Sequence, residues 1–212
     1  MIYEDITVDG FKEYKQLTEM DIEEENTSLW HHSNIAHRFR MIVAVAIAGF
    51  NQLSGGAALA YYVSSSHFFP SQNPDQQSLA ILILINLLQL VVTVVAGQMI
   101  ERYGRRAFMQ EGQKIIIITL FMISFLTIVA PEHKELILML VFIHMVGFSL
   151  SYGPCTFLIG TEIVNDIFYP ALTQWVLITF NLTVVGYLVD LFGLGALCLF
   201  YCLTQILSFV FL

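Results

Sequence analysis

The chain alternates between long apolar runs and short polar links from about residue 40 onward. The hydrocarbon core of a bilayer is about 30 Å thick, so a helix needs about 20 apolar residues to cross it. Six windows with few or no charges meet or approach that length: 41–69, 78–100, 108–130, 136–160, 168–189 and 191–212. These windows leave no polar faces to meet water, so the pattern predicts an all-α membrane protein with a six-helix transmembrane bundle.

The first 37 residues have a different composition from the rest. Nine of the 17 acidic residues lie within the first 25 positions, so the net charge of -8 describes this segment and not the apolar body. A short amphipathic helix is expected to start near Asp9, and His31 with His32 are interpreted as solvated loop residues. The predicted organisation is an acidic cytosolic leader at 1–37 followed by the transmembrane bundle at 38–212.

The overall composition excludes several function classes. Only 12% of the residues are charged, about half the share in a typical soluble domain, and no basic patch is present to bind nucleic acid. The three cysteines, Cys155, Cys198 and Cys202, form no CxxC pair, which argues against disulfides and zinc. No nucleophile, catalytic carboxylate pair or metal cluster stands out, so we predict neither an enzyme nor a bound cofactor.

The distribution of the cations predicts the orientation in the membrane. Eight of the nine cations precede the first window or surround the link between the second and third, and only Lys134 lies in a loop on the other side. Loops rich in Lys and Arg remain cytoplasmic. Six crossings then place both termini in the cytoplasm, whereas nothing in the sequence indicates which cellular membrane is used.

The link between the second and third windows carries the most distinctive local pattern, Glu101-Arg102-Tyr103-Gly104-Arg105-Arg106. Gly104 can supply a turn with positive φ, and guanidinium groups can make bidentate contacts with carboxylates at neighbouring helix ends. Such a cluster could lock one conformation of a rocking bundle. An ordinary positively charged cytoplasmic loop would explain it equally well.

Polar residues in the middle of the first window form a second pattern, Asn51-Gln52-Leu53-Ser54-Gly55-Gly56. Polar side chains at that depth are costly unless they face a cavity or another helix, and amides suit sugar hydroxyls because they both donate and accept. Gly55 and Gly56 favour a break in the helix, as at transporter binding sites. The alternative is that these small residues serve only helix packing.

The fourth window contains the third pattern, Gly153-Pro154-Cys155-Thr156-Phe157, with Glu162 near its end. Pro154 removes a backbone hydrogen bond and should kink the helix. Phe157 could close a pocket or stack on the apolar face of a sugar, and Glu162 is the expected partner of the arginines. A Gly-Pro kink alone is common in membrane helices.

In this order, the three patterns resemble those of the sugar porter family of the major facilitator superfamily. The resemblance covers about residues 38–212 and corresponds to the C-terminal six-helix half, spans seven to twelve, while the leader resembles the intracellular linker. Glu101 to Arg106 fits the family pattern fully. Ala57, Thr156 and Phe157 depart from it, where the family has Asn, Pro and Trp, and Tyr169-Pro170 replaces the usual Arg.

The resemblance implies a site and a mechanism. The residues in sugar-contacting positions are Asn51, Gln52, Gln89, Phe157 and Asn181. Those implied in gating are Tyr61, Tyr62, Gly153 and Pro154. The cytoplasmic lock would comprise Glu101, Arg102, Gly104, Arg105, Arg106 and Glu162. The implied function is transport of a hexose-like carbohydrate by alternating access, with a monosaccharide and the lipid bilayer as partners, and with a second six-helix half or a homodimer completing the pathway.

Two other functions remain open at the level of the sequence. The N-terminal six-span half and the family's C-terminal tail are absent from the sequence, which favours a non-transporting six-span remnant that acts as a sensor or assembly partner. A self-associating channel is less favoured, since no paired Asn-Pro-Ala or Pro-x-Asp/Glu-x-x-Lys/Arg pattern occurs. The sequence does not reveal the identity of the sugar or whether protons are coupled to transport.

Overall fold

The computed structural model describes residues 35–64, 74–164 and 167–212. The predicted amphipathic helix near Asp9 and the histidines at 31 and 32 lie outside these residues. Contacts divide the chain into two units, Met1–Met41 and Ile42–Leu212, which are described separately. In the first unit, the described residues form the start of helix α2.

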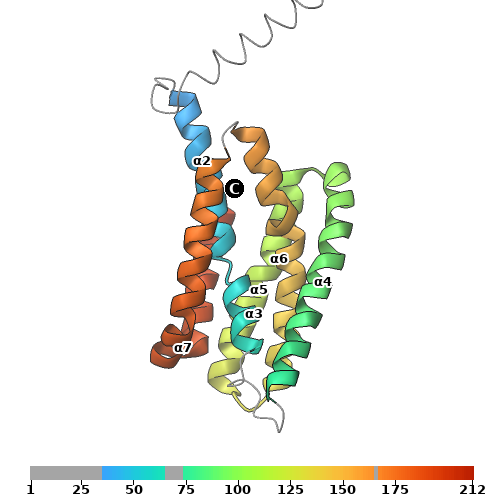
Figure 1. The fold of residues 1–212 in the computed structure, drawn as a ribbon, viewed down its shortest axis with the longest axis vertical. Helices are drawn as coiled ribbons and strands as arrows, with labels where there is room; N and C mark the ends of the chain where they lie inside the picture. The colour runs from blue at the N-terminus through green and yellow to red at the C-terminus, as the bar shows by residue number, and fades with distance from the viewer. Residues whose placement is uncertain (1–34, 65–73, 165–166) are drawn as a thin grey trace, which may run out of the picture. The chain divides into compact units, whose positions relative to one another are not determined.

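The described residues are helical apart from short links. The helices are α2 (Ile35–Gln52), α3 (Gly56–Ser64), α4 (Pro74–Tyr103), α5 (Arg105–Val129), α6 (Lys134–Ile163) and α7 (Phe168–Phe211). Within the second unit, α3 to α7 lie side by side with roughly aligned axes (Figure 1). α5 packs against both α6 and α7 and so links these two helices within the bundle.

The long helix α7 consists of two helices joined at a break. Gly193 has a φ of 82° and a ψ of 156°, which are not helical angles. Asn181 and Tyr201, on opposite sides of the break, are joined by a hydrogen bond of 3.3 Å, so the two halves fold back on each other. The 44 residues of α7 therefore provide the last two predicted crossings, with the boundary at Gly193 and not near residue 190.

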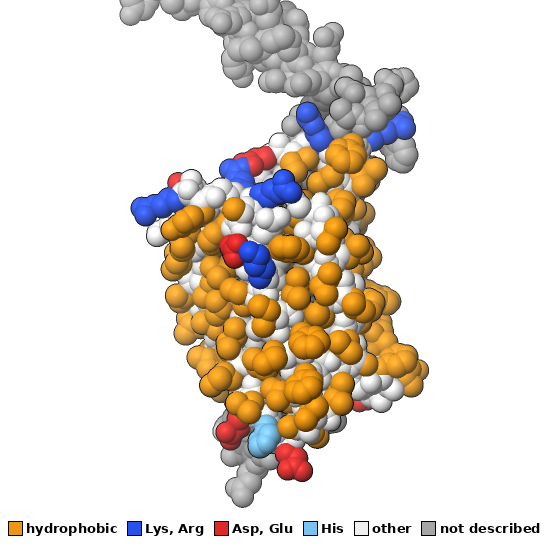
Figure 2. All heavy atoms as spheres, turned by 180° about the vertical axis from the view of Figure 1, so that it is seen from behind, with side chains coloured by type: hydrophobic (Ala, Val, Ile, Leu, Met, Phe, Trp, Pro, Cys, Tyr) orange, Lys and Arg blue, Asp and Glu red, His pale blue; other side chains and the backbone are white. Residues whose placement is uncertain are grey.

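Five described helical segments, with α2 and α3 taken together, are long and apolar enough to cross a membrane. They correspond to the six predicted windows once α7 is divided at Gly193. Hydrophobic side chains cover most of the face shown in Figure 2. On α4 this exposure is extensive, since the successive residues Leu82, Ile83 and Leu84 are 37%, 58% and 54% exposed. Such a surface suits contact with lipid more than with water.

A single glycine makes the turn between α4 and α5. Gly104 has a φ of 83°, and its backbone N–H donates to the carbonyl of Ile100 over 3.0 Å. A residue with a Cβ adopts this conformation only at a cost, which explains the glycine. The turn that the sequence predicted at Gly104 is confirmed.

Candidate functional site

The first predicted window is broken between α2 and α3. Gln52 ends α2, Gly55 adopts a φ of 77°, and Gly56 begins α3. The break that the two glycines predicted is therefore present. It removes the regular helical hydrogen bonds from a run of backbone carbonyls, which must find other partners inside an apolar bundle.

One of these carbonyls is satisfied locally. The hydroxyl of Ser54 donates to the carbonyl of Asn51 over 2.6 Å, and the N–H of Ser54 donates to the same carbonyl over 3.3 Å. Ser54 is fully buried. It therefore stabilises the break and does not face a ligand.

Side chains of α7 satisfy three further carbonyls at the break. Gln205 donates to the carbonyl of Phe50 over 3.0 Å, Asn181 to that of Gln52 over 3.0 Å, and Thr204 to that of Leu53 over 2.9 Å. Both halves of α7 contribute. The conformation of the break thus depends on residues more than 120 positions further along the chain.

The side chain of Asn51 lies at the break and is 7% exposed. Its Oδ1 atom has no hydrogen-bond partner among the described residues. A buried amide oxygen without a partner is unfavourable, so this atom is available to a donor that enters the bundle. Gln52, the next residue, is only partly buried.

The remaining residues in sugar-contacting positions occupy different surroundings. Gln89 of α4 donates to the sulfur of Met145 over 3.2 Å, and a thioether is a weak acceptor. Asn181 lies beside Gln52 through its hydrogen bond to that residue's carbonyl. Phe157 is 56% exposed on α6. The structure therefore brings Asn51, Gln52 and Asn181 together, whereas no described hydrogen bond joins Gln89 to the break.

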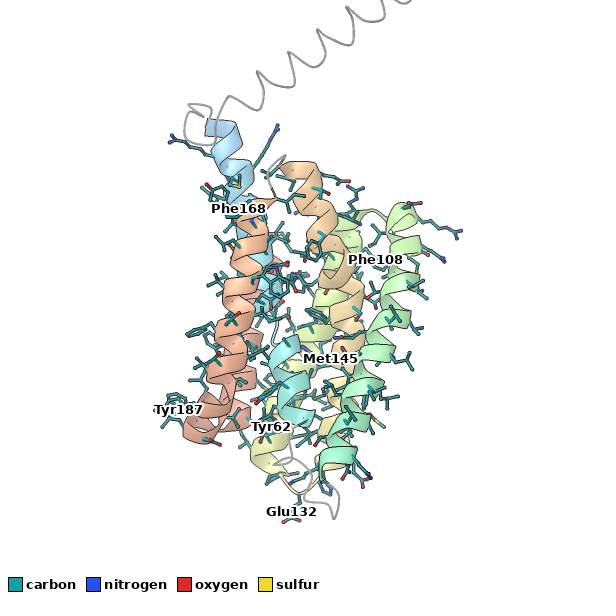
Figure 3. All side chains as sticks on the ribbon, in the orientation of Figure 1. Tyr62, Phe108, Glu132, Met145, Phe168 and Tyr187 are labelled. Carbon is teal, nitrogen blue, oxygen red and sulfur yellow. The ribbon has the colours of Figure 1, made fainter. Side chains whose placement is uncertain are left out.

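The residues implied in gating lie on α3 and α6. Tyr61 is 53% exposed, and Tyr62 lines a cavity of about 460 Å³ beside the Gly193 break. Figure 3 places Tyr62 and Glu132 toward the same end of the bundle. On α6, the helix continues through Pro154, and a Cβ on Gly153 would lie 3.4 Å from the hydroxyl oxygen of Thr93. Gly153 therefore permits a close approach of α4 and α6.

The arginine cluster, Arg102, Arg105 and Arg106, lies around the α4–α5 turn. Arg105 forms an ion pair with Glu162 near the end of α6, as the sequence predicted for a carboxylate partner. The two side chains are 41% and 44% exposed. Glu101, Arg102 and Arg106 are exposed. The pair joins α5 to α6 at one end of the bundle.

Sequence reasoning missed the residues of α7 that hold the break. Thr204 and Gln205 are polar positions within an apolar window, and this contrast could have identified them. Tyr201 was missed as well, although its ring packs on Gly55. Among the described residues, no group of three His, Cys, Asp or Glu side chains is placed to hold a metal ion.

The family model and the individual proteins that match this chain agree on one family. The model of the family described as "Sugar (and other) transporter" matches residues 5–172. Facilitated glucose transporter member 7 of solute carrier family 2 from Mus musculus is 31% identical over 132 residues, which are 60% of this chain and 25% of that protein. The facilitated trehalose transporter Tret1 of Apis mellifera ligustica is 26% identical over 174 residues, 74% of this chain and 33% of that protein.

A bacterial relative extends the comparison. The arabinose-proton symporter of Bacillus subtilis (strain 168) is 28% identical over 129 residues, 59% of this chain and 27% of that protein. The matched segments thus span a third or less of the length of these three relatives.

Proposed function

Because this chain belongs to the sugar (and other) transporter family, we propose that it moves a monosaccharide-type sugar across a membrane by alternating access, as one six-helix half of the pathway. Family membership confirms the predicted family and the prediction that the chain is not an enzyme. With the apolar helices, it also confirms a multi-pass membrane protein of the all-α class.

The observation that carries this proposal is the buried Asn51 amide at the helix break. Its unpartnered Oδ1 atom can accept a hydrogen bond from a sugar hydroxyl, and the partly buried Gln52 amide beside it can both donate and accept. A broken helix at the membrane midplane is a common element of transporter substrate sites. Gln89, Asn181 and Phe157 would complete the sugar site.

Two groups of residues take different roles in this proposal. Tyr61, Tyr62, Gly153 and Pro154 would gate access to the site. Glu101, Arg102, Gly104, Arg105, Arg106 and Glu162 would form the lock at one end of the bundle. The lock would face the cytoplasm together with both termini, since Lys and Arg gather in cytoplasmic loops. A second six-helix half or a second copy of the chain would supply the opposite wall.

Uptake of radiolabelled D-glucose by liposomes containing the full chain tests the proposal. Gln52→Ala should weaken the apparent affinity for the sugar about tenfold, because one or two amide hydrogen bonds are lost. Gln98→Ala is the matched control, since Gln98 lies on the exposed face of α4. Equal uptake kinetics for the wild-type chain and Gln52→Ala would contradict the proposed site.

A further inference from the structure

Four polar side chains form a buried cluster between α5, α6 and α7. They are Gln113 of α5, Tyr152 of α6, and Gln205 and Ser208 of α7, and each is 0% exposed. We call them the Gln205 cluster. Neither the helix break nor the arginine cluster includes Gln113, Tyr152 or Ser208, so the proposed function assigns these three residues no role.

Hydrogen bonds connect the members of the Gln205 cluster to one another and to the helix break. The hydroxyls of Tyr152 and Ser208 lie 2.8 Å apart, and either could donate. The Nε2 group of Gln113 donates to the Tyr152 hydroxyl over 2.7 Å and to the Ser208 hydroxyl over 2.9 Å. The Tyr152 hydroxyl donates to Oε1 of Gln205 over 2.8 Å. Gln205 then donates through Nε2 to the carbonyl of Phe50 over 3.0 Å. The series therefore ends on the backbone of the helix break.

Tyr152 stabilises the orientation of the Gln205 amide at the break. A glutamine amide can present either its oxygen or its NH₂ group to a neighbour. The Phe50 carbonyl can only accept, so it requires the NH₂ group, and the Tyr152 hydroxyl stabilises this orientation by donating to Oε1. Gln113 reinforces this arrangement, because it acts on Tyr152 only as a donor.

The Phe50 carbonyl is the acceptor through which α2 could continue into α3 as one helix. In an uninterrupted helix this carbonyl would accept from the N–H of Ser54, four residues later. In the structure the Ser54 N–H donates instead to Asn51, over 3.3 Å. Gln205 occupies the Phe50 carbonyl and so competes with the helical hydrogen bond. Asn51 and Gln52 lie between these two positions.

We propose that Gln205 is a positioning residue for the Asn51–Gln52 amide pair, and that Tyr152 acts through it by stabilising the orientation of its amide. Gln205 keeps α2 and α3 separate at the break without itself contacting the sugar. The effect of Gln205 on sugar binding rests on the proposed function. Its effect on the conformation of the helix break does not.

Hydrogen–deuterium exchange of the purified full chain in lipid nanodiscs tests the structural part. Gln205→Leu should change the exchange of the peptide spanning residues 49–59 at least about fivefold, as expected for one lost hydrogen bond. Tyr152→Phe, which removes only a hydroxyl, should change exchange in the same peptide. Ser124→Ala is the matched control, because it removes a buried hydrogen bond between α5 and α7, to the carbonyl of Gly195, that does not involve the Gln205 cluster.

Unchanged exchange at 49–59 in Tyr152→Phe would overturn the role of Tyr152, even if Gln205→Leu fails to fold. An equal change in Ser124→Ala would overturn the proposal too, since it would show a general loosening of the bundle. The double variant should match Gln205→Leu alone, because Tyr152 acts through Gln205. An additive effect would contradict that coupling.

Equilibrium binding of D-glucose to the same samples tests the consequence for the site. Gln205→Leu should weaken binding about fivefold, and Ser124→Ala should leave it unchanged. If the wild-type chain binds no D-glucose, the proposed function fails while the exchange result still decides the positioning role. If the wild-type chain binds and Gln205→Leu binds equally well, the positioning role fails while the proposed function stands.

Discussion

The ring of Tyr201 packs directly against the backbone of Gly55. A Cβ atom built on Gly55 would lie 2.7 Å from the Cδ2 atom of Tyr201, closer than real Cβ contacts. The hydroxyl of the same tyrosine donates to Asn181, which in turn donates to the carbonyl of Gln52. Tyr201 thus supports the helix break at two points. Gly55 is constrained both by its φ of 77° and by the contact with the ring of Tyr201.

Gly55→Ala should lower the stability of the bundle by about 2–4 kcal/mol. About 1 kcal/mol comes from the positive φ and the rest from overpacking against Tyr201. Thermal unfolding of the purified chain in detergent measures the effect.

Two other glycines separate these contributions. Gly193 combines a positive φ with an extended ψ but has no atom within 4 Å of an added Cβ, so Gly193→Ala should cost about 1–3 kcal/mol from the backbone alone. Gly97 in α4 has neither constraint, and Gly97→Ala should be neutral or stabilising by up to about 1 kcal/mol. Equal effects at all three positions would contradict the account of Gly55.

Gly112→Ala should also destabilise the bundle, by about 1–3 kcal/mol. A Cβ on Gly112 would lie 2.8 Å from the backbone nitrogen of Ser151 and 2.9 Å from the carbonyl oxygen of Gly147. Backbone atoms of α6 cannot move aside as a flexible side chain can. Gly186→Ala is the control, with no atom within 4 Å, and a lower melting temperature for it than for Gly112→Ala would refute this explanation.

Arg105→Glu should destabilise the chain by about 0.5–1 kcal/mol, because it places two carboxylates where the ion pair with Glu162 stands. The expected loss of stability is small because both side chains are partly exposed to solvent. Restoring opposite charges with Arg105→Glu and Glu162→Arg together should recover most of the loss. Melting temperatures at low and high salt check this, since salt should reduce the difference.

A second ion pair allows the role of the Arg105–Glu162 pair in transport to be tested. Lys114 and Glu111 form an exposed pair within α5, over 2.6 Å, and join no second helix. Glu111→Gln should change uptake of D-glucose less than Glu162→Gln does, because only the latter pair links α5 to α6. Equal effects on uptake would mean that the Arg105–Glu162 pair has no special role in transport.

The sequence allowed the helices to be predicted because their causes are local. Charge-free windows locate the crossings, and Gly104 and Gly55 mark turns that need a positive φ. The sequence predicts the division of α7 at Asp190, about three residues too early, because a charged residue between two apolar windows indicates the membrane–water interface. The chain instead breaks at Gly193, where glycine allows the required angles.

The partners of the helix break could not be predicted in the same way. Asn181 was expected to contact sugar, and the structure shows that its amide also holds the Gln52 carbonyl. Gln205 stands out as a polar residue in an apolar window, but its role, like that of Tyr152, depends on which helices become neighbours. That arrangement is set by the packing of α5, α6 and α7 and not by residue spacing.

The hydrogen bonds that side chains of α7 donate to the helix break also impose an order on assembly. The hydrogen bonds from Asn181, Thr204 and Gln205 span 129, 151 and 155 residues of chain. During synthesis the first crossing is therefore complete long before its carbonyls have partners. Contacts of such long range form late, so the break reaches its final shape only when the last helix has joined the bundle.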